Sequence, residues 1–181
     1  MKDTALGARC QALQLILTDV DGVLTDGRLL LLPDGQEAKA FHVRDGLAVV
    51  MAQLAGLRVG LLSGRSSAAV ARRAEELRLT VARQGVRDKP AALREILAEL
   101  GLEAHQVAYV GDDLNDVAVL GQVGLSAAPA DAPFDVRAQV FMTLQTPGGQ
   151  GCFREFVDAI LRARGDWDRV AAEVAGADMS I

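Results

Sequence analysis

Short apolar runs alternate with longer amphipathic stretches along most of the chain. The runs LQLIL from Leu13, LRVGLL from Leu57 and VAYV from Val107 are apolar or nearly so at consecutive positions. Such runs are typical of parallel strands buried on both faces. The stretches between them, such as the one that follows Lys89, repeat apolar residues every three or four positions, as amphipathic helices do. Strands that alternate with helices predict an α/β fold with a doubly wound, Rossmann-like parallel sheet.

The same pattern predicts the bounds of the elements. We expect strands at 13–20, 57–64, 80–82, 106–113, 123–128 and 139–144, and helices at 46–54, 66–77, 89–100 and 151–163. Asp45 is predicted to cap the first helix, and Gly101 to end the third. The segment 28–41 reads as two strands joined by a Pro-Asp-Gly turn, which predicts a β-hairpin inserted into the sheet fold.

Composition narrows the class of protein. A chain of 181 residues predicts one domain, 1–181, with flexible ends at 1–12 and 170–181. The net charge of −5 argues against a nucleic-acid partner. No apolar run approaches the length of a membrane span, and the N-terminus lacks the apolar core of a signal peptide. Cys10 and Cys152 are far apart, so we expect a reduced, cytoplasmic protein that binds no membrane.

Polar clusters follow three of the predicted strands. They are Asp19-Val20-Asp21, Ser63-Gly64-Arg65 and Gly111-Asp112-Asp113, and Lys89 begins a helix after a fourth strand. The carboxyl ends of parallel strands meet at one edge of a sheet, where ligands bind. We therefore expect the four polar groups to converge on one site.

These residue types suit phosphoryl transfer. Asp19, Asp21 and Asp112 offer the hard oxygen ligands that Mg²⁺ prefers, and a cation lets neighbouring carboxylates stay ionised. Asp19 could attack phosphorus as a nucleophile, and Asp21 could protonate the leaving oxygen. Ser63 and Lys89 could hold the remaining phosphoryl oxygens. Each motif alone is more often a turn, cap or loop, and only the ordered set of four favours catalysis.

The four motifs also resemble those of a known family. DVDGVLTDG, LLSGR, the lysine of VRDKP and VGDDLND are similar to the signature motifs of the haloacid dehalogenase superfamily of phosphohydrolases. The resemblance implies Asp19 as nucleophile and Asp21 as acid/base. It implies Mg²⁺ bound by Asp19, the backbone carbonyl of Asp21 and Asp112, a phosphoryl group held by Ser63 and Lys89, and a metal site supported by Asp113 and Asp116. Dehalogenases of the superfamily lack an aspartate at the position of Asp21, so a phosphoric monoester hydrolase is favoured.

The spacing of the motifs leaves no room for a cap domain. The interval from Asp21 to Ser63 is filled by the hairpin and one helix, and the interval from Lys89 to Asp112 by one helix and one strand. An uncapped site is open to water, which weakens electrostatic catalysis. We expect a neighbouring subunit to cover it, and the apolar hairpin 28–41 is the predicted contact.

Further segments narrow the resemblance. FHVRDGLAV, GGQGCFREF and the short tail are similar to the 3-deoxy-D-manno-octulosonate 8-phosphate phosphatase family. That resemblance implies a cytosolic homotetramer that releases phosphate from an eight-carbon sugar acid used in lipopolysaccharide biosynthesis. It implies a substrate site that includes His42, Val43, Arg44, Asp45, Gly46, Gly64, Arg65 and Arg73. The tail 176–181 is expected to cover the site of an adjacent subunit.

Several alternatives stay open on the sequence alone. Family members often carry an arginine where this chain has Val50, so a phosphatase for nine-carbon sugar acid 9-phosphates is an alternative. A broad small-metabolite phosphatase is another. A regulatory subunit that keeps the fold, or a phospho-accepting receiver domain, would need neither Asp21 as an acid/base nor the whole set of motifs.

Overall fold

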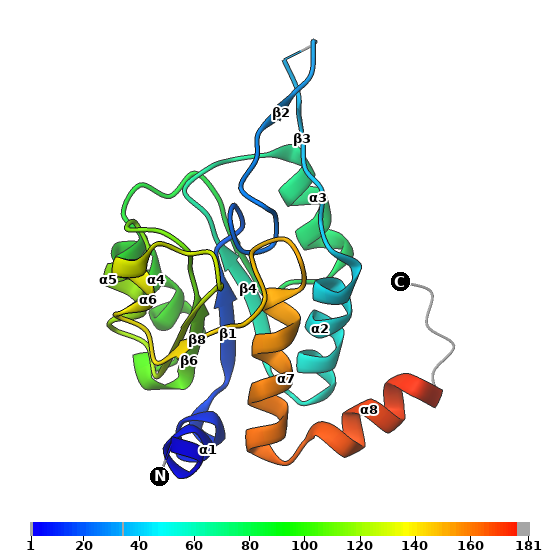
Figure 1. Ribbon diagram of the computed structural model, residues 1–181, viewed down its shortest axis with the longest axis vertical. Helices are drawn as coiled ribbons and strands as arrows, with labels where there is room; N and C mark the ends of the chain where they lie inside the picture. Colours follow the sequence, from blue (N-terminus) through cyan, green and yellow to red (C-terminus); the bar gives the residue numbers. More distant parts are fainter. Residues whose placement is uncertain (1, 34, 177–181) are drawn as a thin grey trace.

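The centre of the molecule is a six-stranded parallel sheet. The computed structural model describes residues 2–33 and 35–176, and its sheet has the spatial order β5–β4–β1–β6–β7–β8 (Figure 1). The strands are β1 (Leu15–Thr18), β4 (Arg58–Leu62), β5 (Val81–Arg83), β6 (Val107–Val110), β7 (Leu125–Ala128) and β8 (Met142–Thr143). The predicted doubly wound α/β fold is confirmed.

Helices cover both faces of this sheet. On one face lie α1 (Lys2–Ala12), α2 (Val43–Leu54), α3 (Ala68–Glu76), α7 (Cys152–Arg164) and α8 (Trp167–Gly176). On the other face lie α4 (Lys89–Leu100), α5 (Val117–Leu120) and α6 (Phe134–Arg137), and a 3₁₀ turn, η1 (Ala104–Gln106), precedes β6. Figure 1 shows α2 and α7 on one side of the strands and α4, α5 and α6 on the other.

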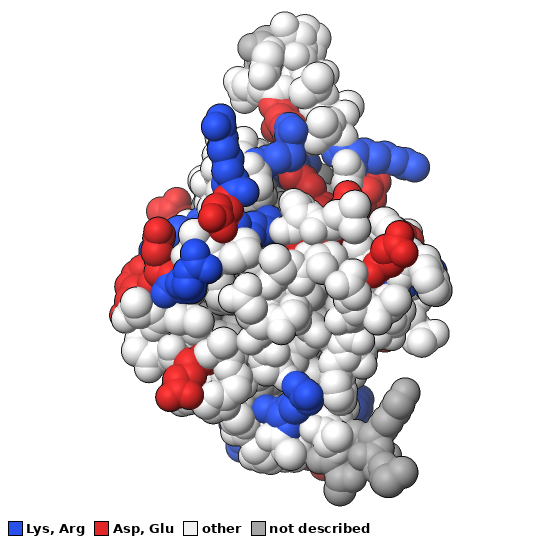
Figure 2. Space-filling view, turned by 90° about the vertical axis from the view of Figure 1, so that its left-hand side faces the viewer, with Lys and Arg blue, Asp and Glu red and all other residues white. Residues whose placement is uncertain are grey.

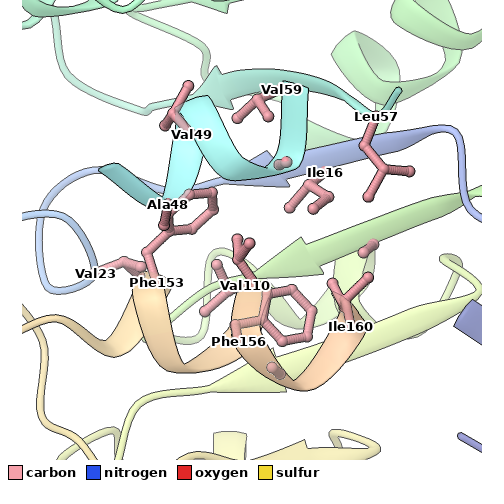
Figure 3. Close-up of a cluster of buried hydrophobic side chains, with 14 of the residues drawn as sticks. Ile16, Val23, Ala48, Val49, Leu57, Val59, Val110, Phe153, Phe156 and Ile160 are labelled. Atoms are coloured by element: carbon pink, nitrogen blue, oxygen red, sulfur yellow. The ribbon is translucent and has the colours of Figure 1, made fainter. Parts of the chain in front are cut away.

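Alternation along β1 explains why its sequence is apolar throughout. Ile16 packs with α2 and α7, whereas Leu15 and Leu17 pack into the second cluster with α4, and all three are fully buried. Successive side chains of a strand point to opposite faces, so a sheet covered on both sides needs apolar residues at every position. Figure 3 shows Ile16 between the aromatic rings of α7 and the side chains of α2.

The order of the strands creates a switch point beside β1. The chain passes from β1 to β4 and β5 on one side, then returns to place β6 against the other side of β1. Thr18, the last residue of β1, aligns with both Leu61 and Val110. The residues that follow β1 and β6 therefore meet at one level, in the crevice where α/β sheets bind ligands.

The predicted hairpin projects from this edge of the sheet. It consists of β2 (Leu30–Leu31) and β3 (Glu37–Ala38), which pair antiparallel. Leu30 and Leu31 are 61% and 69% exposed. Figure 2 shows that the described part of the hairpin tip carries no charged side chain, whereas both signs of charge gather near its base. Among the described residues between Asp21 and Ser63, only the hairpin, α2 and β4 form regular elements, so no cap domain is inserted there.

Helices that the sequence did not predict lie at both ends of the chain. Residues 2–12 form helix α1, with Cys10 buried against α7. The Arg164 guanidinium donates to the carbonyl oxygens of Cys10 and Leu13 and so ties α1 to the end of α7. Helix α8 was not predicted either, and it reaches into the region 170–181 that was expected to be flexible. Residues 1 and 177–181, which include most of the tail expected to cover a neighbouring site, lie outside the described residues.

Across the part of the chain that is described, no helix is long and apolar enough to cross a membrane.

Phe156 provides a test of the core between α7 and the sheet. It is fully buried in the first cluster, so replacing it with alanine removes buried area and leaves a cavity. We expect Phe156→Ala to lower the free energy of unfolding by about 3–5 kcal/mol in urea denaturation. The matched control is Phe134→Ala, at a phenylalanine that is 75% exposed, where we expect a change below about 0.5 kcal/mol. Similar losses for the two variants would contradict this packing.

Candidate active site

The loop after β1 brings Asp19 and Asp21 to the switch point. The Asp19 N–H donates to the carbonyl of Val110 on β6, which extends the parallel ladder by one residue. Gly22 follows with φ = 91°, a left-handed conformation that favours glycine. A Cβ at Gly22 would also overlap the Asp112 carboxylate. Glycine is therefore required here so that the loops after β1 and β6 can approach.

The predicted convergence of the polar clusters is borne out by the geometry. A pocket of about 440 Å³ opens at the carboxyl edge of the sheet. The residues that line it are Asp19, Asp21, Gly27, Ser63, Gly64, Arg65, Asp112, Asp113, Leu114 and Asn115. Sequence reasoning did not single out Gly27, Leu114 or Asn115, although Gly27 lies within the DVDGVLTDG motif and the other two lie within VGDDLND.

Lys89 reaches the floor of this site from the first turn of α4. Asp88 caps that helix by accepting from the N–H of Ala91, which fixes the start of the helix at Lys89. The ammonium group is buried, 3.1 Å from Oδ2 of Asp19 and 2.6 Å from Oδ1 of Asp116. A buried cation needs such partners, because removing its charge from water is costly. Through these two ion pairs, Lys89 links the loop after β1 to the loop after β6.

The carboxylate of Asp116 accepts four hydrogen bonds. Its Oδ1 accepts from Lys89 and from the Tyr109 hydroxyl, and its Oδ2 accepts from the N–H groups of Asp112 and Asp113 at 3.1 and 3.4 Å. The Asp116 side chain is fully buried, and each of its oxygens already has two donors. This arrangement suits an orienting role for Asp116 in the loop that carries Asp112. Asp113 is exposed, and its Oδ1 accepts from the N–H of Leu114.

Burial and crowding raise the proton affinity of two carboxyl groups. Burial, together with the charge of Asp116, raises the pKa of Asp19 to about 6 against the opposing effect of Lys89. Burial, together with the charges of Asp19 and Asp116, raises the pKa of Asp112 to about 8. Burial lowers the pKa of Lys89, but the two neighbouring carboxylates outweigh it and raise that pKa overall. The site therefore holds more negative charge than Lys89 alone can balance.

These residues fit a divalent cation. Carboxylate oxygens of Asp19, Asp112 and Asp116 lie within 4.8 Å of one another. Oδ1 of Asp19 is buried without a hydrogen-bond partner, an arrangement that costs free energy unless a ligand compensates for it. Hard oxygen donors with water access suit Mg²⁺. Because Asp116 is already fully hydrogen-bonded, Asp19 and Asp112 are the side chains free to bind it.

The predicted sugar-contacting residues fall into two groups. Gly64 and Arg65 line the main pocket, whereas the segment 42–46 and Arg73 do not. His42, Asp45, Gly46 and Arg73 border a separate, mostly apolar cavity, and Val43, Arg44 and Arg73 border a third. Within one copy of the chain, these residues therefore do not line the main pocket.

The local geometry of this segment also corrects one prediction. Helix α2 begins at Val43, and its N-cap is His42, whose Nδ1 accepts from the N–H of Arg44. Asp45 is not the cap, because it lies inside the first turn and accepts from the N–H of Arg154 at 2.8 Å. Burial raises the pKa of Asp45 to about 6. Gly46 leaves room for the Arg73 guanidinium, which a Cβ would meet.

Two charged residues near the pocket were missed by sequence reasoning. They are Glu37 and Lys39, both from the hairpin. Lys39 contacts the carboxylates of Asp21 and Glu37, and Glu37 contacts the guanidinium of Arg65. The available signal was the alternation in Glu-Ala-Lys, which places both charges on one face of a strand that was expected to be apolar. A short exposed hairpin gives no reason to expect such side chains to reach a site on the sheet.

Comparison with known proteins defines the class. Residues 29–124, just over half of the chain, match the family described as haloacid dehalogenase-like hydrolase. The 3-deoxy-D-manno-octulosonate 8-phosphate phosphatase of Haemophilus influenzae is 41% identical over 157 residues, which cover 87% of each chain. A probable phosphatase of the YrbI family from Pseudomonas syringae superposes with a TM-score of 0.92 at 41% identity, over 96% of this chain and 99% of that chain.

A third comparison bears on ligands. The 3-deoxy-D-manno-octulosonate 8-phosphate phosphatase of Moraxella catarrhalis, solved in complex with a magnesium ion, a phosphate ion and a KDO molecule, superposes with a TM-score of 0.90. It is 34% identical, over 93% of this chain and 97% of that chain. The chain belongs to the haloacid dehalogenase-like hydrolases and, within them, to the 3-deoxy-D-manno-octulosonate 8-phosphate phosphatase family. Both resemblances seen in the sequence are confirmed.

The acidic cluster predicts a pH-dependent effect of Mg²⁺ on stability. The folded, metal-free protein holds protons on Asp19 and Asp112 up to about pH 6 and 8, whereas both groups ionise near pH 3.8 when unfolded. The contribution of these groups to stability therefore falls as pH rises from about 4 to 8. Mg²⁺ competes with those protons, so we expect it to raise the melting temperature more at about pH 8.5 than at about pH 5.5.

Two asparagine variants provide the controls for this measurement. Asp112→Asn removes the carboxyl group with the higher of these two pKa values and one cation ligand, so it should abolish most of the difference between the two pH values. Asp168→Asn, at an exposed carboxylate on α8, should retain it. An equal effect of Mg²⁺ at both pH values in the unmodified protein would contradict the assigned cluster.

Proposed function

We propose that this chain is a Mg²⁺-dependent phosphatase that hydrolyses 3-deoxy-D-manno-octulosonate 8-phosphate through an aspartyl-phosphate intermediate. The observation that carries the proposal is the joint placement of Asp19, Asp21, Ser63, Lys89 and Asp112 at the switch point of the sheet. The curated relatives at about 40% identity support the same reaction and substrate.

Asp19 is the proposed nucleophile. Lys89 holds its Oδ2 at 3.1 Å, which leaves Oδ1 without a hydrogen-bond partner at the pocket floor. One carboxylate oxygen attacks phosphorus, the bond from phosphorus to the sugar oxygen breaks, and an acyl phosphate forms on Asp19. Ser63 and Lys89 hold the equatorial phosphoryl oxygens while this happens.

Asp21 is the proposed acid and base. Its proton passes to the departing sugar oxygen in the first half-reaction. In the second half-reaction, Asp21 accepts a proton from the water that attacks the acyl phosphate, and inorganic phosphate leaves with the Asp19 carboxylate restored. Mg²⁺ bound by Asp19, Asp112 and the backbone carbonyl of Asp21 would neutralise charge on the phosphoryl oxygens. Asp116 and Asp113 would support that cation site by orienting the loop after β6.

The substrate class follows from charge. A sugar-acid phosphate is anionic at both ends, and Arg65 at the pocket wall can bind a carboxylate with two parallel hydrogen bonds. The segment 42–46 and Arg73 would contribute to substrate binding from an adjacent subunit, since they line other cavities in their own chain. Val50 keeps the nine-carbon sugar acid 9-phosphate as the second candidate substrate.

Assembly and location complete the proposal. We infer a homotetramer formed through the hairpin, whose leucines are exposed in the single chain, with an adjacent subunit covering the open pocket. A cytoplasmic location and a role in lipopolysaccharide biosynthesis accompany the proposed substrate. The tail 176–181 remains a candidate cover for the neighbouring site.

A substrate panel with a nucleophile variant tests the function. We expect phosphate release with Mg²⁺ to be fastest from 3-deoxy-D-manno-octulosonate 8-phosphate, slower from nine-carbon sugar acid 9-phosphates and slowest from simple sugar phosphates. Asp19→Asn should abolish turnover, because an amide cannot form the acyl phosphate, while the protein stays folded by circular dichroism. Turnover in the variant at a tenth of the normal rate would refute the nucleophile assignment, and equal rates across the panel would favour a broad phosphatase.

Light scattering tests the assembly. We expect the mass of a tetramer at micromolar concentration, and a lower mass for a variant with Leu30→Asp and Leu31→Asp, because charge at the hairpin tip opposes burial there. Phe134→Asp, at an exposed apolar residue on α6, serves as the control that should keep the full mass. A monomeric unmodified protein would contradict the proposed assembly.

A further inference from the structure

Two charged residues at the base of the hairpin have no part in the scheme above, yet they surround its proposed acid. The Lys39 ammonium contacts Oδ1 of Asp21 and lies 2.7 Å from Oε1 of Glu37. Arg65 closes a ring, with its Nη2 2.7 Å from Oε2 of Glu37 and its Nε 3.8 Å from Oδ2 of Asp21. We call these four side chains the charged ring.

Lys39 is the unusual member of the charged ring. Its side chain is 1% exposed, although it sits beside an open pocket on a protruding hairpin. Arg65, in contrast, is 48% exposed and faces the pocket. A buried ammonium group cannot move to a substrate without leaving its two carboxylates, and removing one of them would leave a buried charge unpaired. The contacts of Lys39 are therefore internal and directed at Asp21 and Glu37.

Glu37 supports this arrangement by bridging the two cations. Hydrogen bonds from Lys39 and Arg65 lower the pKa of Glu37, so it stays ionised. Hydrogen bonds to Asp21 and Glu37 outweigh burial and raise the pKa of Lys39, so it stays charged. Because Glu37 and Lys39 are two residues apart on an extended segment, both side chains reach the same face of the hairpin. The hairpin thus presents a fixed cation to the loop that follows β1.

We propose that Lys39 is a positioning residue that orients the Asp21 carboxylate for proton transfer to the leaving oxygen. This inference rests on the proposed phosphatase function. Holding Oδ1 of Asp21 against Lys39 directs Oδ2 toward the pocket, where Arg65 contacts it at a longer distance. The hairpin then has a second role besides assembly, since Lys39, directly after its strand β3, sets the geometry of the acid.

A purely structural role for the charged ring makes a different prediction. If Lys39 only fastens the hairpin to the sheet domain, its loss lowers stability and affects all substrates alike. If it acts through Asp21, its loss matters most for a poor leaving group, which needs a proton most. Loss of Lys39 should then also have no further effect once Asp21 cannot donate a proton.

The experiment combines these two criteria in a double-mutant cycle. Lys39→Met, Asp21→Asn and the double variant are assayed with 3-deoxy-D-manno-octulosonate 8-phosphate and with para-nitrophenyl phosphate, whose leaving group needs little protonation. We expect Lys39→Met to lower kcat on the sugar phosphate by about 10- to 100-fold, with KM nearly unchanged and a smaller loss on the aryl phosphate. In the Asp21→Asn background the same substitution should change kcat on the sugar phosphate less than about twofold.

Further variants keep the test decisive. Glu37→Gln, at a partly exposed side chain, keeps Lys39 but removes the charge of one of its two carboxylate partners. We expect it to lower kcat less than Lys39→Met does, with the same dependence on the leaving group. Arg94→Met, at an exposed arginine on α4, should leave both activities unchanged. Equal losses on both phosphates, or full additivity of Lys39→Met with Asp21→Asn, would overturn the positioning role while leaving the phosphatase function intact. If the unmodified protein hydrolyses neither phosphate, both the proposed function and this inference are overturned.

Discussion

The structure depends on one buried cation between two carboxylates. Lys89 lies within 3.1 Å of Asp19 and 2.6 Å of Asp116, and these three residues come from a strand end, a helix start and the loop after another strand. Removing Lys89 would leave the buried carboxylates of Asp19 and Asp116 without the cation that they share. The cluster therefore keeps the ends of β1, α4 and β6 together, and it imposes the excess negative charge that a divalent cation can balance.

The register of the parallel sheet brings the residues of this cluster together. The register that aligns Thr18 with Val110 puts Asp19 one residue and Asp112 two residues past the ends of two neighbouring strands. Apolar residues on both faces of β1 hold that register, because a shift by one residue would exchange the two faces of the strand. Glycine at position 22 then lets the two acidic loops approach closely. Core packing and the chemistry of the site are thus linked through the register of two strands.

The hairpin connects a second set of charges to the same site. Its leucine-rich tip suits contact with another subunit, and its base carries Glu37 and Lys39 against Asp21. An uncapped site has few elements of its own that can shape the surroundings of the acid. A short insertion with an apolar tip and a charged base can serve both needs, since neighbouring segments of the hairpin face different environments.

The sequence by itself determined the sheet and the main site residues. Apolar runs such as that of β1 require burial on both faces, and polar clusters directly after such runs, as at Asp19 and Asp112, must meet at one edge of a parallel sheet. Both inferences use interactions that are local in sequence or fixed by strand geometry. The helix α4 was predictable for the same reason, because its apolar period is local and Gly101 marks its end.

Only the tertiary structure decided the features that depend on contacts between distant segments. Helix α1 has weak amphipathic character, and its packing depends on α7 and on Arg164, which lies far along the chain. Asp45 looked like a helix cap, but its carboxylate is engaged by the N–H of Arg154 on α7, and His42 caps the helix instead. Lys39 belongs to an exposed hairpin by sequence, yet it is buried against Asp21. In each case the contact joins two segments that the packing of the layers brings together. No local pattern of residues therefore predicts the partner.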